Sequence, residues 1–463
     1  SRTCQAQDQA HIAHIDTPDS NTKGNSGRKT NSHKTAGSPW RAVVLGVAFC
    51  LLALFCSRFG GSFAIFLLPS SSAEKFNSPA RNMQPSISEF LAGQSASRFG
   101  TQLFANLCRQ GTGNVVMSPV SLSVALCMAA SGTSLGGEAH QQLAQLLQLP
   151  DVSSAAQKEE VETQIHEKLK ELVHSLDSDD PLVKMLIANS IWTDPDVKQS
   201  YISTCQETYS AKHFPRKSAA EINKWVEDKT MGMIKNILSD EPHGPAVLLN
   251  AVYFKGVWKV KFDPIRTQDS NFVRFNGEQV PCKMMQLGQK RLRYGETSHT
   301  QYVLLPYGET DRYTSIIMLP KKEGVQGMKE TIDEITAPNF FSDASVVNAQ
   351  VKPVIVELPR FKIEYGIKPM KDALMTMDVK APFVPGGHFK RMTDDESVHI
   401  MDVYHKAVIE VNEEGTEAAA ATAVAMTRSL VMPVDLKFNR PFLFIVMDIK
   451  NKLLLFCAKV EEI

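Results

Sequence analysis

Between about residue 83 and the end of the chain, apolar positions recur with the spacings of both helices and strands. Residues 88–108 place Phe and Leu side chains on one helical stripe, whereas 246–254 is a continuous apolar run with the length of a buried strand. The pattern is neither a repeat nor a regular alternation of strands and helices, which predicts an α+β fold with large mixed or antiparallel sheets. The other expected helices are 119–130, 138–147, 159–176 and 221–231, and the other expected strands are 183–192, 303–305, 314–319, 354–358, 438–446 and 453–458.

The first 82 residues follow a different pattern. Residues 1–41 are polar with almost no apolar periodicity, which predicts a disordered tail. Residues 42–68 are largely apolar, and their first part has the length of the hydrophobic region of a signal peptide. A secretory signal is therefore the first interpretation, a membrane-anchoring signal that uses the whole stretch is the second, and a buried core helix is the third. Residues 69–82 are interpreted as a linker to a globular domain at 83–463.

One segment near the C-terminus fits no ordinary local pattern. Residues 413–430 read EEGTEAAAATAVAMTRSL, in which the alanines favour helix while the Thr and Val residues around them favour strand. As a strand, one face would carry Thr416 and every second residue to Met426 without any charge, and the other face would carry Glu417 as its only acid. Such a segment can enter the middle of a sheet without burying an ion. An Ala-rich linker or a solvated helix is the alternative.

The flanks of this segment carry a family resemblance. The sequences HKAV at 405–408, EEGTEAAAAT at 413–422 and FNRPFLF at 438–444, in this order and spacing, resemble the reactive loop and C-terminal strands of the serpin family. Further sequences that resemble serpin landmarks are SPVS at 118–121, INKWV at 222–226, NAVYFKGVW at 250–258 and LPRFKI at 358–363. The resemblance covers 83–463 and leaves out the polar tail and the apolar stretch.

The resemblance implies the serpin fold, with an exposed reactive-centre loop at 413–437, and a protease inhibitor rather than an enzyme. A protease would attack a peptide bond of the loop and form an acyl-enzyme, after which the loop would insert into a sheet and trap the covalent complex. The hinge of that loop would consist of Glu413, Glu414, Gly415, Thr416, Glu417, Ala418, Ala419, Ala420 and Ala421. The structural residues implied for the shutter and breach, where the sheet opens, are Ser118, Ser121, Asn250, Trp258 and His405.

Arg428 is the expected site of attack, and Ser429 follows it. A long, always charged side chain suits the acidic specificity pocket of a trypsin-like serine protease. The commonest register of the family places the bond one residue later, at Ser429–Leu430, which would favour elastase- or subtilisin-like enzymes.

Two other classes of function stay open. One is a non-inhibitory serpin that carries a ligand or acts as a chaperone. The other is a hydrolase with Ser134 as its nucleophile, because residues 132–136 read GTSLG. That chemistry requires a strand before the serine, whereas the run before Ser134 is expected to be a helix.

Composition and charge narrow the range of partners. The 463 residues contain 50 basic and 50 acidic side chains, which argues against a dedicated nucleic-acid surface. The eight cysteines are scattered without metal-ligand spacing, and Cys127 and Cys457 lie in apolar runs where we expect burial. No cofactor or metal is predicted. We expect a monomer that is secreted or enters the secretory pathway, or alternatively one tethered to a membrane through 42–68, with a trypsin-like serine protease as its covalent partner.

Overall fold

The structure is a computed structural model, and it describes residues 94–149, 155–176, 180–193, 196–215, 218–241, 245–338, 340, 341, 346, 349–364, 368–416 and 432–463. The chain divides into two units, Ser1–Pro79 and Ala80–Ile463, and every described residue belongs to the second. The tail, the apolar stretch and the linker predicted for residues 1–82 therefore lie outside the described residues.

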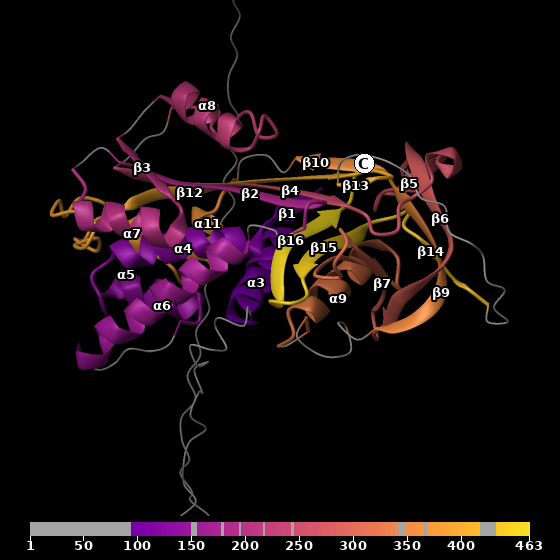
Figure 1. Ribbon diagram of the computed structural model, residues 1–463, viewed down its shortest axis with the longest axis horizontal. Coiled ribbons are helices and arrows are strands. Elements are labelled where there is room, and N and C mark those ends of the chain that lie inside the picture. Colours follow the sequence, from indigo (N-terminus) through magenta and orange to yellow (C-terminus); the bar gives the residue numbers. More distant parts are fainter. Residues whose placement is uncertain are drawn as a thin grey trace, which may run out of the picture. The chain divides into compact units, whose positions relative to one another are not determined.

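The second unit combines helices with two large sheets (Figure 1). Its described helices are α3 (Gln94–Gln110), α4 (Pro119–Gly132), α5 (Glu138–Leu146), α6 (Ala155–Ser175), α7 (Gln199–Tyr209), α8 (Ala219–Lys229), α9 (Gly324–Ile335) and α11 (Lys371–Met375), with short 3-10 turns η1 (Pro264–Arg266) and η2 (Ala381–Phe383). Its described strands are β1 (Val115–Met117), β2 (Val183–Thr193), β3 (Lys212–Pro215), β4 (Ala246–Val257), β5 (Gln268–Val273), β6 (Gln279–Glu296), β7 (Thr300–Pro306), β8 (Tyr313–Pro320), β9 (Gln350–Pro359), β10 (Phe361–Glu364), β11 (Lys368–Pro369), β12 (Ile400–Val411), β13 (Gly415–Thr416), β14 (Val434–Lys437), β15 (Phe442–Asp448) and β16 (Leu453–Val460).

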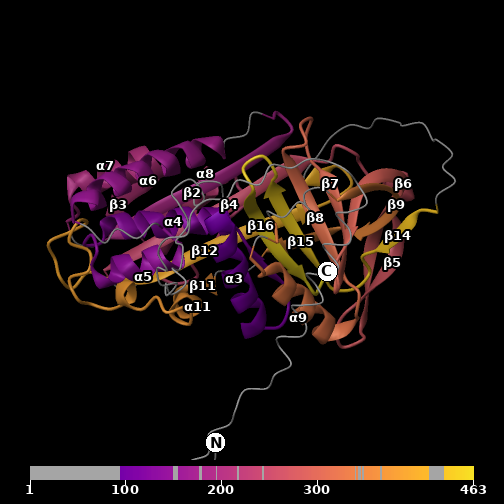
Figure 2. The ribbon, with the colours of Figure 1, turned by 90° about the horizontal axis from the view of Figure 1, so that it is seen from below.

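One sheet has the order β10-β12-β4-β2-β3, with β11 paired to β12 and β13 paired to β4. Helix α8 lies on one face of this sheet, and α4, α5 and α6 lie on the other (Figure 1). The other sheet has the order β1-β16-β15-β8-β7-β6-β9-β14, with β5 paired to β6. Figure 2 shows its strands β16, β15, β8 and β7 side by side, with α3 and α9 close to them.

Apolar residues form three clusters around these sheets. The first lies beneath α3 and α4 and includes Ala246 and Leu248 of β4. The second joins the two sheets and is rich in aromatic residues. The third packs α8 against the opposite face of β4, where Leu249 lies with Ile222 of the helix. Both faces of β4 are therefore buried, which explains its continuous apolar sequence.

Local sequence signals explain two of the helix starts. Helix α4 begins after Ser118, whose side chain accepts a hydrogen bond from the Ser121 amide, and Pro119 occupies its first turn. All of its residues are buried, so it is a central helix without a polar face. Helix α8 begins with a capping box in which Ser218 and Glu221 hydrogen-bond to each other's backbone.

The elements expected from the apolar pattern are confirmed where the structure describes them, with differences of a few residues at their ends. Residues 88–93 of the first expected helix lie outside the described residues. The pattern did not predict β5, the long strand β6 or helices α7 and α9. Strand β14 (Val434–Lys437) lies within the range 413–437 expected for the reactive loop, and residues 417–431 of that range lie outside the described residues.

Candidate functional site

The centre of the first sheet is a seam between two parallel strands. Strand β12 pairs with β4 from Ile400↔Ala246 to Val408↔Tyr253, and His405 lies directly beside Asn250. Every other described strand pair of this sheet that includes β4 is antiparallel. A new strand that entered this seam would therefore have the same orientation relative to both of its neighbours.

A cluster of buried polar side chains holds the seam together. Asn250 donates from Nδ2 to Ser121 Oγ at 2.6 Å and to Asn189 Oδ1 at 2.6 Å. His405 contacts Asn250 Oδ1 through Nδ1 at 2.6 Å, and its Nε2 accepts a hydrogen bond from the Ser118 amide at 3.0 Å. The hydrogen bonds of His405 therefore link β12 to β4 and to the start of α4, which ties both strands and the helix beneath them to one point.

These contacts define the protonation state of His405. Because Nε2 accepts a hydrogen bond, the ring proton must be on Nδ1, from which it is donated to Asn250. Burial lowers the pKa of His405 to about 4, although its contact with Asn250 acts in the opposite direction. The imidazole is therefore neutral at neutral pH and serves as a structural link between the strands.

The second group of predicted residues lies where the chain leaves β12. Glu413 is buried, and its carboxylate accepts two hydrogen bonds from the Arg360 Nε, at 2.6 and 2.7 Å. It also accepts a hydrogen bond from the Thr267 hydroxyl. Burial alone would raise the pKa of Glu413, but the hydrogen bonds from Arg360 and Thr267 hold it below its ordinary value. The carboxylate is therefore a charged anchor for the start of the loop.

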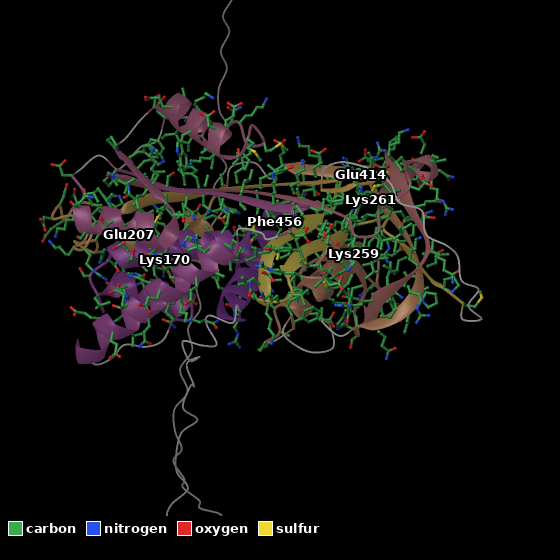
Figure 3. The ribbon with its side chains drawn as sticks, viewed as in Figure 1. Lys170, Glu207, Lys259, Lys261, Glu414 and Phe456 are labelled. Carbon is green, nitrogen blue, oxygen red and sulfur yellow. The ribbon has the colours of Figure 1, made fainter. Side chains whose placement is uncertain are left out.

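Glu414 forms a second ion pair, with Lys261 in the segment that follows β4. Its Oε2 lies 2.7 Å from the Lys261 ammonium, and the two residues lie together beyond the end of β4 in Figure 3. Trp258 adds a further contact between the same two segments, because its Nε1 donates a hydrogen bond to the Asn412 carbonyl at 3.0 Å. Its ring stacks on Tyr307, with 4.3 Å between ring centroids. Segment 412–414 is thus fixed to the segment that follows β4.

Gly415 marks the point at which the chain reverses. Its φ of +136° lies in a region that favours glycine, and an added Cβ would lie 2.2 Å from the Gly256 carbonyl oxygen. After this turn, Gly415 and Thr416 pair with Val257 and Gly256 as strand β13, antiparallel to β4. The first two residues beyond the turn are therefore already part of the sheet.

The structure thus brings the predicted residues into two places. Ser118, Ser121, Asn250 and His405 form one contiguous cluster, and Trp258 lies with the first part of the hinge (Glu413, Glu414, Gly415 and Thr416) at the end of β4. The remaining hinge residues (Glu417, Ala418, Ala419, Ala420 and Ala421) and the predicted reactive bond at Arg428 and Ser429 lie outside the described residues.

Sequence reasoning missed four residues of these sites. Arg360, Thr267 and Lys261 hold the two acids of the hinge, and Asn189 completes the cluster around Asn250. The signal for Asn189 was readable, because an amide in a buried strand requires partners. Arg360, Thr267 and Lys261 could not be found from a local pattern, since each lies far along the chain from the hinge acid that it contacts.

The described residues give no support to a hydrolase. Ser134 follows helix α4, so the strand that a nucleophile elbow requires is replaced by a helix. Among the described residues, no group of three or more His, Cys, Asp or Glu side chains is arranged to hold a metal. Cys127 and Cys457 are buried as predicted, and burial raises the pKa of the Cys127 thiol to about 12. No helix within the described part of the chain is long and apolar enough to cross a membrane.

Comparison with known proteins identifies the family. A family profile described as Serpin (serine protease inhibitor) matches residues 94–463. The chain belongs to the serpin family. This serpin is 31% identical to human antithrombin-III over 391 residues, which cover 79% of this chain and 80% of that protein. It is also 31% identical to serpin-ZXA of Oryza sativa subsp. japonica over 368 residues, which cover 75% of this chain and 89% of the relative.

The fold is likewise that of solved serpin structures. The serpin is similar to tengpin, a thermophilic serpin solved in its native state, with a TM-score of 0.70 and 26% identity over 86% of this chain and 98% of tengpin. The family and the α+β serpin fold expected from the sequence are therefore confirmed. Serpins in general are inhibitors of serine proteases rather than enzymes, which supports protease inhibition as the broad class of function.

Proposed function

We propose that this serpin inhibits a trypsin-like serine protease by acting as a suicide substrate. The protease serine attacks the Arg428 carbonyl, the bond to Ser429 breaks, and an acyl-enzyme forms. The loop then enters the seam between β4 and β12 before water can release the protease. Addition of a strand to a sheet in this way is the mode by which serpin reactive loops act.

The observation that carries this proposal is the pairing of β13 with β4. Because Gly415 and Thr416 already face Val257 and Gly256, continuation of the same register assigns a partner to every later loop residue. Ala418 would face Phe254, and Thr422 would face Asn250. Insertion would therefore place a hydroxyl next to Asn250, where His405 is now.

The side chains of the loop fit the two faces that this register assigns to them. Opposite residues of an antiparallel pair share a face. The residues that would face Leu249 and Ala251 are Ala423 and Ala421, and both of these β4 positions pack in the cluster beneath α8. Only small side chains can enter between a sheet and a helix that already covers it. The run of alanines supports insertion under α8.

The length of β4 also fits the proposed bond. In this register, Met426 would face Ala246, the first residue of the twelve-residue strand. Arg428 would then lie just beyond the end of the inserted strand. At about 3.3 Å per residue, insertion would place Arg428 and the attached protease roughly 40 Å from Thr416 along the sheet.

The expected gain in free energy is large enough to drive this change. Roughly a dozen residues that each gain about 0.5–1.5 kcal/mol per hydrogen bond give roughly 6–18 kcal/mol. That range is comparable to the whole stability of an ordinary domain, about 5–15 kcal/mol. The intact form would therefore be held in a less stable state by the hinge and by the cluster at His405.

Incubation with trypsin and a denaturing gel test the proposal. We expect a covalent complex that survives denaturation, and we expect mass spectrometry of the released C-terminal peptide to give Ser429 as its first residue. A peptide beginning at Leu430 would instead assign the bond to Ser429–Leu430. Cleavage without a complex would favour the non-inhibitory alternative, and release of product from an ester substrate by the intact chain would favour the hydrolase.

The variant Ala418→Pro provides the matched control. Proline removes a backbone donor and cannot lie in the middle of a sheet. We expect this variant to be cleaved at the same bond as the unmodified chain but to form little or no covalent complex. A complex of unchanged yield would contradict insertion as the trapping step.

We also propose that residues 42–68 direct the chain into the secretory pathway, either as a cleaved signal or as a membrane tether. Amino-terminal sequencing of the protein from the medium and from washed membranes separates the two. Soluble cytosolic protein with Ser1 intact would contradict both.

A further inference from the structure

A large pocket lies away from the seam and the hinge. It has a volume of about 1080 Å³, and its lining comes from the end of α3, the turn between β5 and β6, helix α9 and the residues that end β16. Small-molecule sites in proteins are concave, mostly apolar and of roughly 300–1,000 Å³. The pocket therefore has the size of a ligand site, and none of the residues proposed for protease inhibition lines it.

Helix α9 presents one face to this pocket. Val325, Lys329 and Ile332 line it and lie at helical spacing on one side of α9. Val325 is an unusually exposed apolar side chain, with 66% of its surface accessible. Phe275 of the β5–β6 turn also lines the pocket and supplies an aromatic surface. An exposed apolar surface inside a hollow is typical of a binding site.

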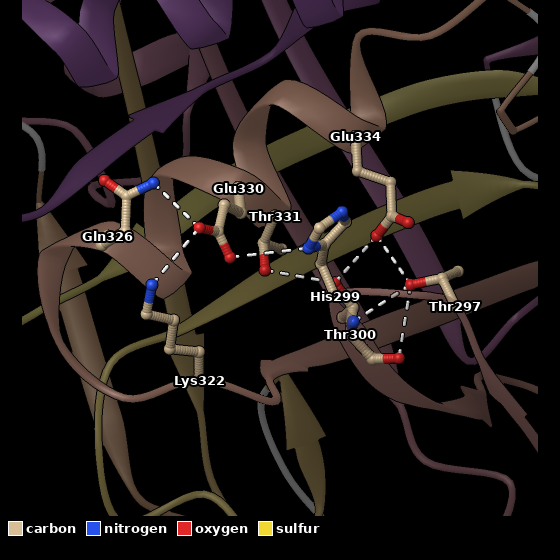
Figure 4. A network of polar contacts seen from close by, with 8 residues as sticks. All are labelled: Thr297, His299, Thr300, Lys322, Gln326, Glu330, Thr331 and Glu334. Carbon is tan, nitrogen blue, oxygen red and sulfur yellow. Dashed lines mark hydrogen bonds and ion pairs between the residues drawn. The ribbon is translucent and has the colours of Figure 1, made fainter.

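The opposite face of α9 is fixed by a polar network (Figure 4). Glu334 accepts hydrogen bonds from the hydroxyls of Thr297 at 2.6 Å and Thr300 at 3.0 Å. Glu330 accepts from Gln326 at 2.8 Å and lies 3.5 Å from the Lys322 ammonium. This face holds the helix to the β6–β7 turn. On the pocket side, Met328 and Ile332 are buried in the first apolar cluster and hold the helix from there, while Val325 and Lys329 remain exposed.

Among the described residues, one basic side chain of the pocket lining is left without a partner. Four basic residues and two acidic ones line the pocket: Arg109, Arg274, Lys329 and Lys459 with Glu461 and Glu462. Arg109 forms an ion pair with Asp333 at 2.5 Å, and Arg274 forms one with Glu278 at 2.9 Å. Lys459 is buried and lies 2.8 Å from the Glu461 carboxylate, so this pair is neutralised internally. Lys329 is exposed, and no described residue forms an ion pair or hydrogen bond with its ammonium.

Arg274 provides a second available donor. Its guanidinium forms an ion pair with Glu278 at 2.9 Å through one terminal nitrogen. Its Nε is buried and has no hydrogen-bond partner. Buried N–H groups nearly always have a partner, and an unsatisfied one is costly. Because this atom is out of reach of solvent, a bound anion would have to contact the accessible part of the guanidinium, since the side chain as a whole is 29% exposed.

We propose that this pocket binds a small amphipathic organic anion. Its apolar body lies against Phe275, Val325 and Ile332, and its acidic group is bound by the Lys329 ammonium and the accessible part of the Arg274 guanidinium. A carboxylate, sulfonate or phosphate fits this requirement, since each is an acceptor for charge-assisted hydrogen bonds. The apolar surface requires the body to be a ring system or an alkyl chain of the size of an ordinary ligand.

Two fluorescent probes with the same ring system test the proposal on the full chain. The first is 8-anilinonaphthalene-1-sulfonate, and the second is N-phenyl-1-naphthylamine, which lacks the sulfonate. We expect one equivalent of the sulfonate probe to bind with a Kd about tenfold or more below that of the uncharged probe, because charge-assisted hydrogen bonds are the strong ones. Equal affinities of the two probes would overturn the assignment of an anion site.

Substitutions in the pocket locate the binding. We expect Lys329→Met and Arg274→Met each to raise the Kd of the sulfonate probe by about tenfold and to leave the uncharged probe nearly unchanged. Val325→Asp should weaken both probes. The matched controls are Lys235→Met and Val351→Asp, which change an exposed lysine and an exposed valine outside the pocket and should change neither Kd.

Lys329 and Val325 are both exposed, so their substitution leaves the core intact and keeps the test interpretable if Arg274→Met fails to fold. Unchanged affinity for the sulfonate probe in Lys329→Met and Val325→Asp would overturn the proposal. The assay contains no protease, and its outcome is therefore independent of whether the chain traps one.

Discussion

Replacement of His405 by glutamine should remove a measurable part of the acid sensitivity of the folded state. His405→Gln keeps a donor for the Asn250 amide oxygen and an acceptor for the Ser118 amide, because the glutamine side chain carries both groups at its end. It lacks a group that titrates near neutral pH. The variant therefore changes the protonation of this position while keeping its two hydrogen bonds.

The magnitude follows from the pKa of the buried imidazole. Burial lowers the pKa of His405 from 6.5 to about 4. Between these values the unfolded chain binds a proton at this position and the folded chain does not, so the free energy of unfolding falls as the pH falls through this window. Because one pH unit is worth about 1.4 kcal/mol, the whole window corresponds to about 3 kcal/mol. Above pH 6.5 this contribution is fully present, and below about pH 4 it is lost.

Urea unfolding at half-unit steps between pH 4 and pH 7.5 measures this contribution. The free energy of unfolding of the unmodified chain should fall over this range by about 3 kcal/mol more than that of His405→Gln. Other groups titrate in both proteins and cancel in the comparison. His174→Gln is the control, since it removes an exposed imidazole at the end of α6, away from the seam. Parallel curves for the unmodified chain and His405→Gln would refute the reasoning.

The hinge gives the remaining predictions. Arg360→Met should lower the free energy of unfolding by about 1.5–3 kcal/mol, because the substitution leaves the buried Glu413 carboxylate without its charged partner. The lower value is expected, because Arg360 is half-exposed. An unchanged urea midpoint would contradict the role of Glu413 as an anchor. Gly415→Ala should cost about 1–3 kcal/mol in a thermal melt, because alanine is strained at this φ and its Cβ would meet the Gly256 carbonyl; equal melting temperatures would show that the turn can shift. Thr416→Arg should raise the ratio of cleaved chain to covalent complex with trypsin. Thr416 pairs with Gly256, and the space beside Gly256 is so narrow that a Cβ added to this glycine would lie 2.8–2.9 Å from aromatic ring atoms. An unchanged ratio would count against insertion. Finally, the nicked unmodified chain should melt at a higher temperature than the intact one, and a lower or equal value would contradict stored strain.

The regular elements could be predicted because their signals are local. Strand β4 is buried on both faces and therefore has a continuous apolar sequence. Helix α3 is buried on one face and therefore has an apolar stripe. Strand β6 was missed because its eighteen residues mix apolar and charged positions, and its register shifts between Leu287 and Lys290. A shift of this kind breaks the period of two on which strand prediction depends.

The site was only partly predictable, for a different reason. The family resemblance placed His405 and Asn250 in the same structural region, and no spacing in the sequence leads to their contact, since the two residues are 155 positions apart. Arg360 and Thr267 meet Glu413 across 53 and 146 positions. Such pairs form because the two sheets come together beyond the end of β4. This arrangement depends on the topology of the whole fold, so a local sequence pattern cannot predict it.

The short pairing of β13 with β4 gives the proposed insertion a direction. Because the loop is already paired with β4 at Gly415 and Thr416, further pairing extends from that end, and each residue that pairs brings the next one into register. A defect close to Gly415 would therefore stop the process before it begins, whereas the same defect near Met426 would act after most of the travel is complete. Tolerance of insertion to substitution should therefore increase from Thr416 to Met426, and sequence variation among natural variants of this chain should rise in the same order over that segment.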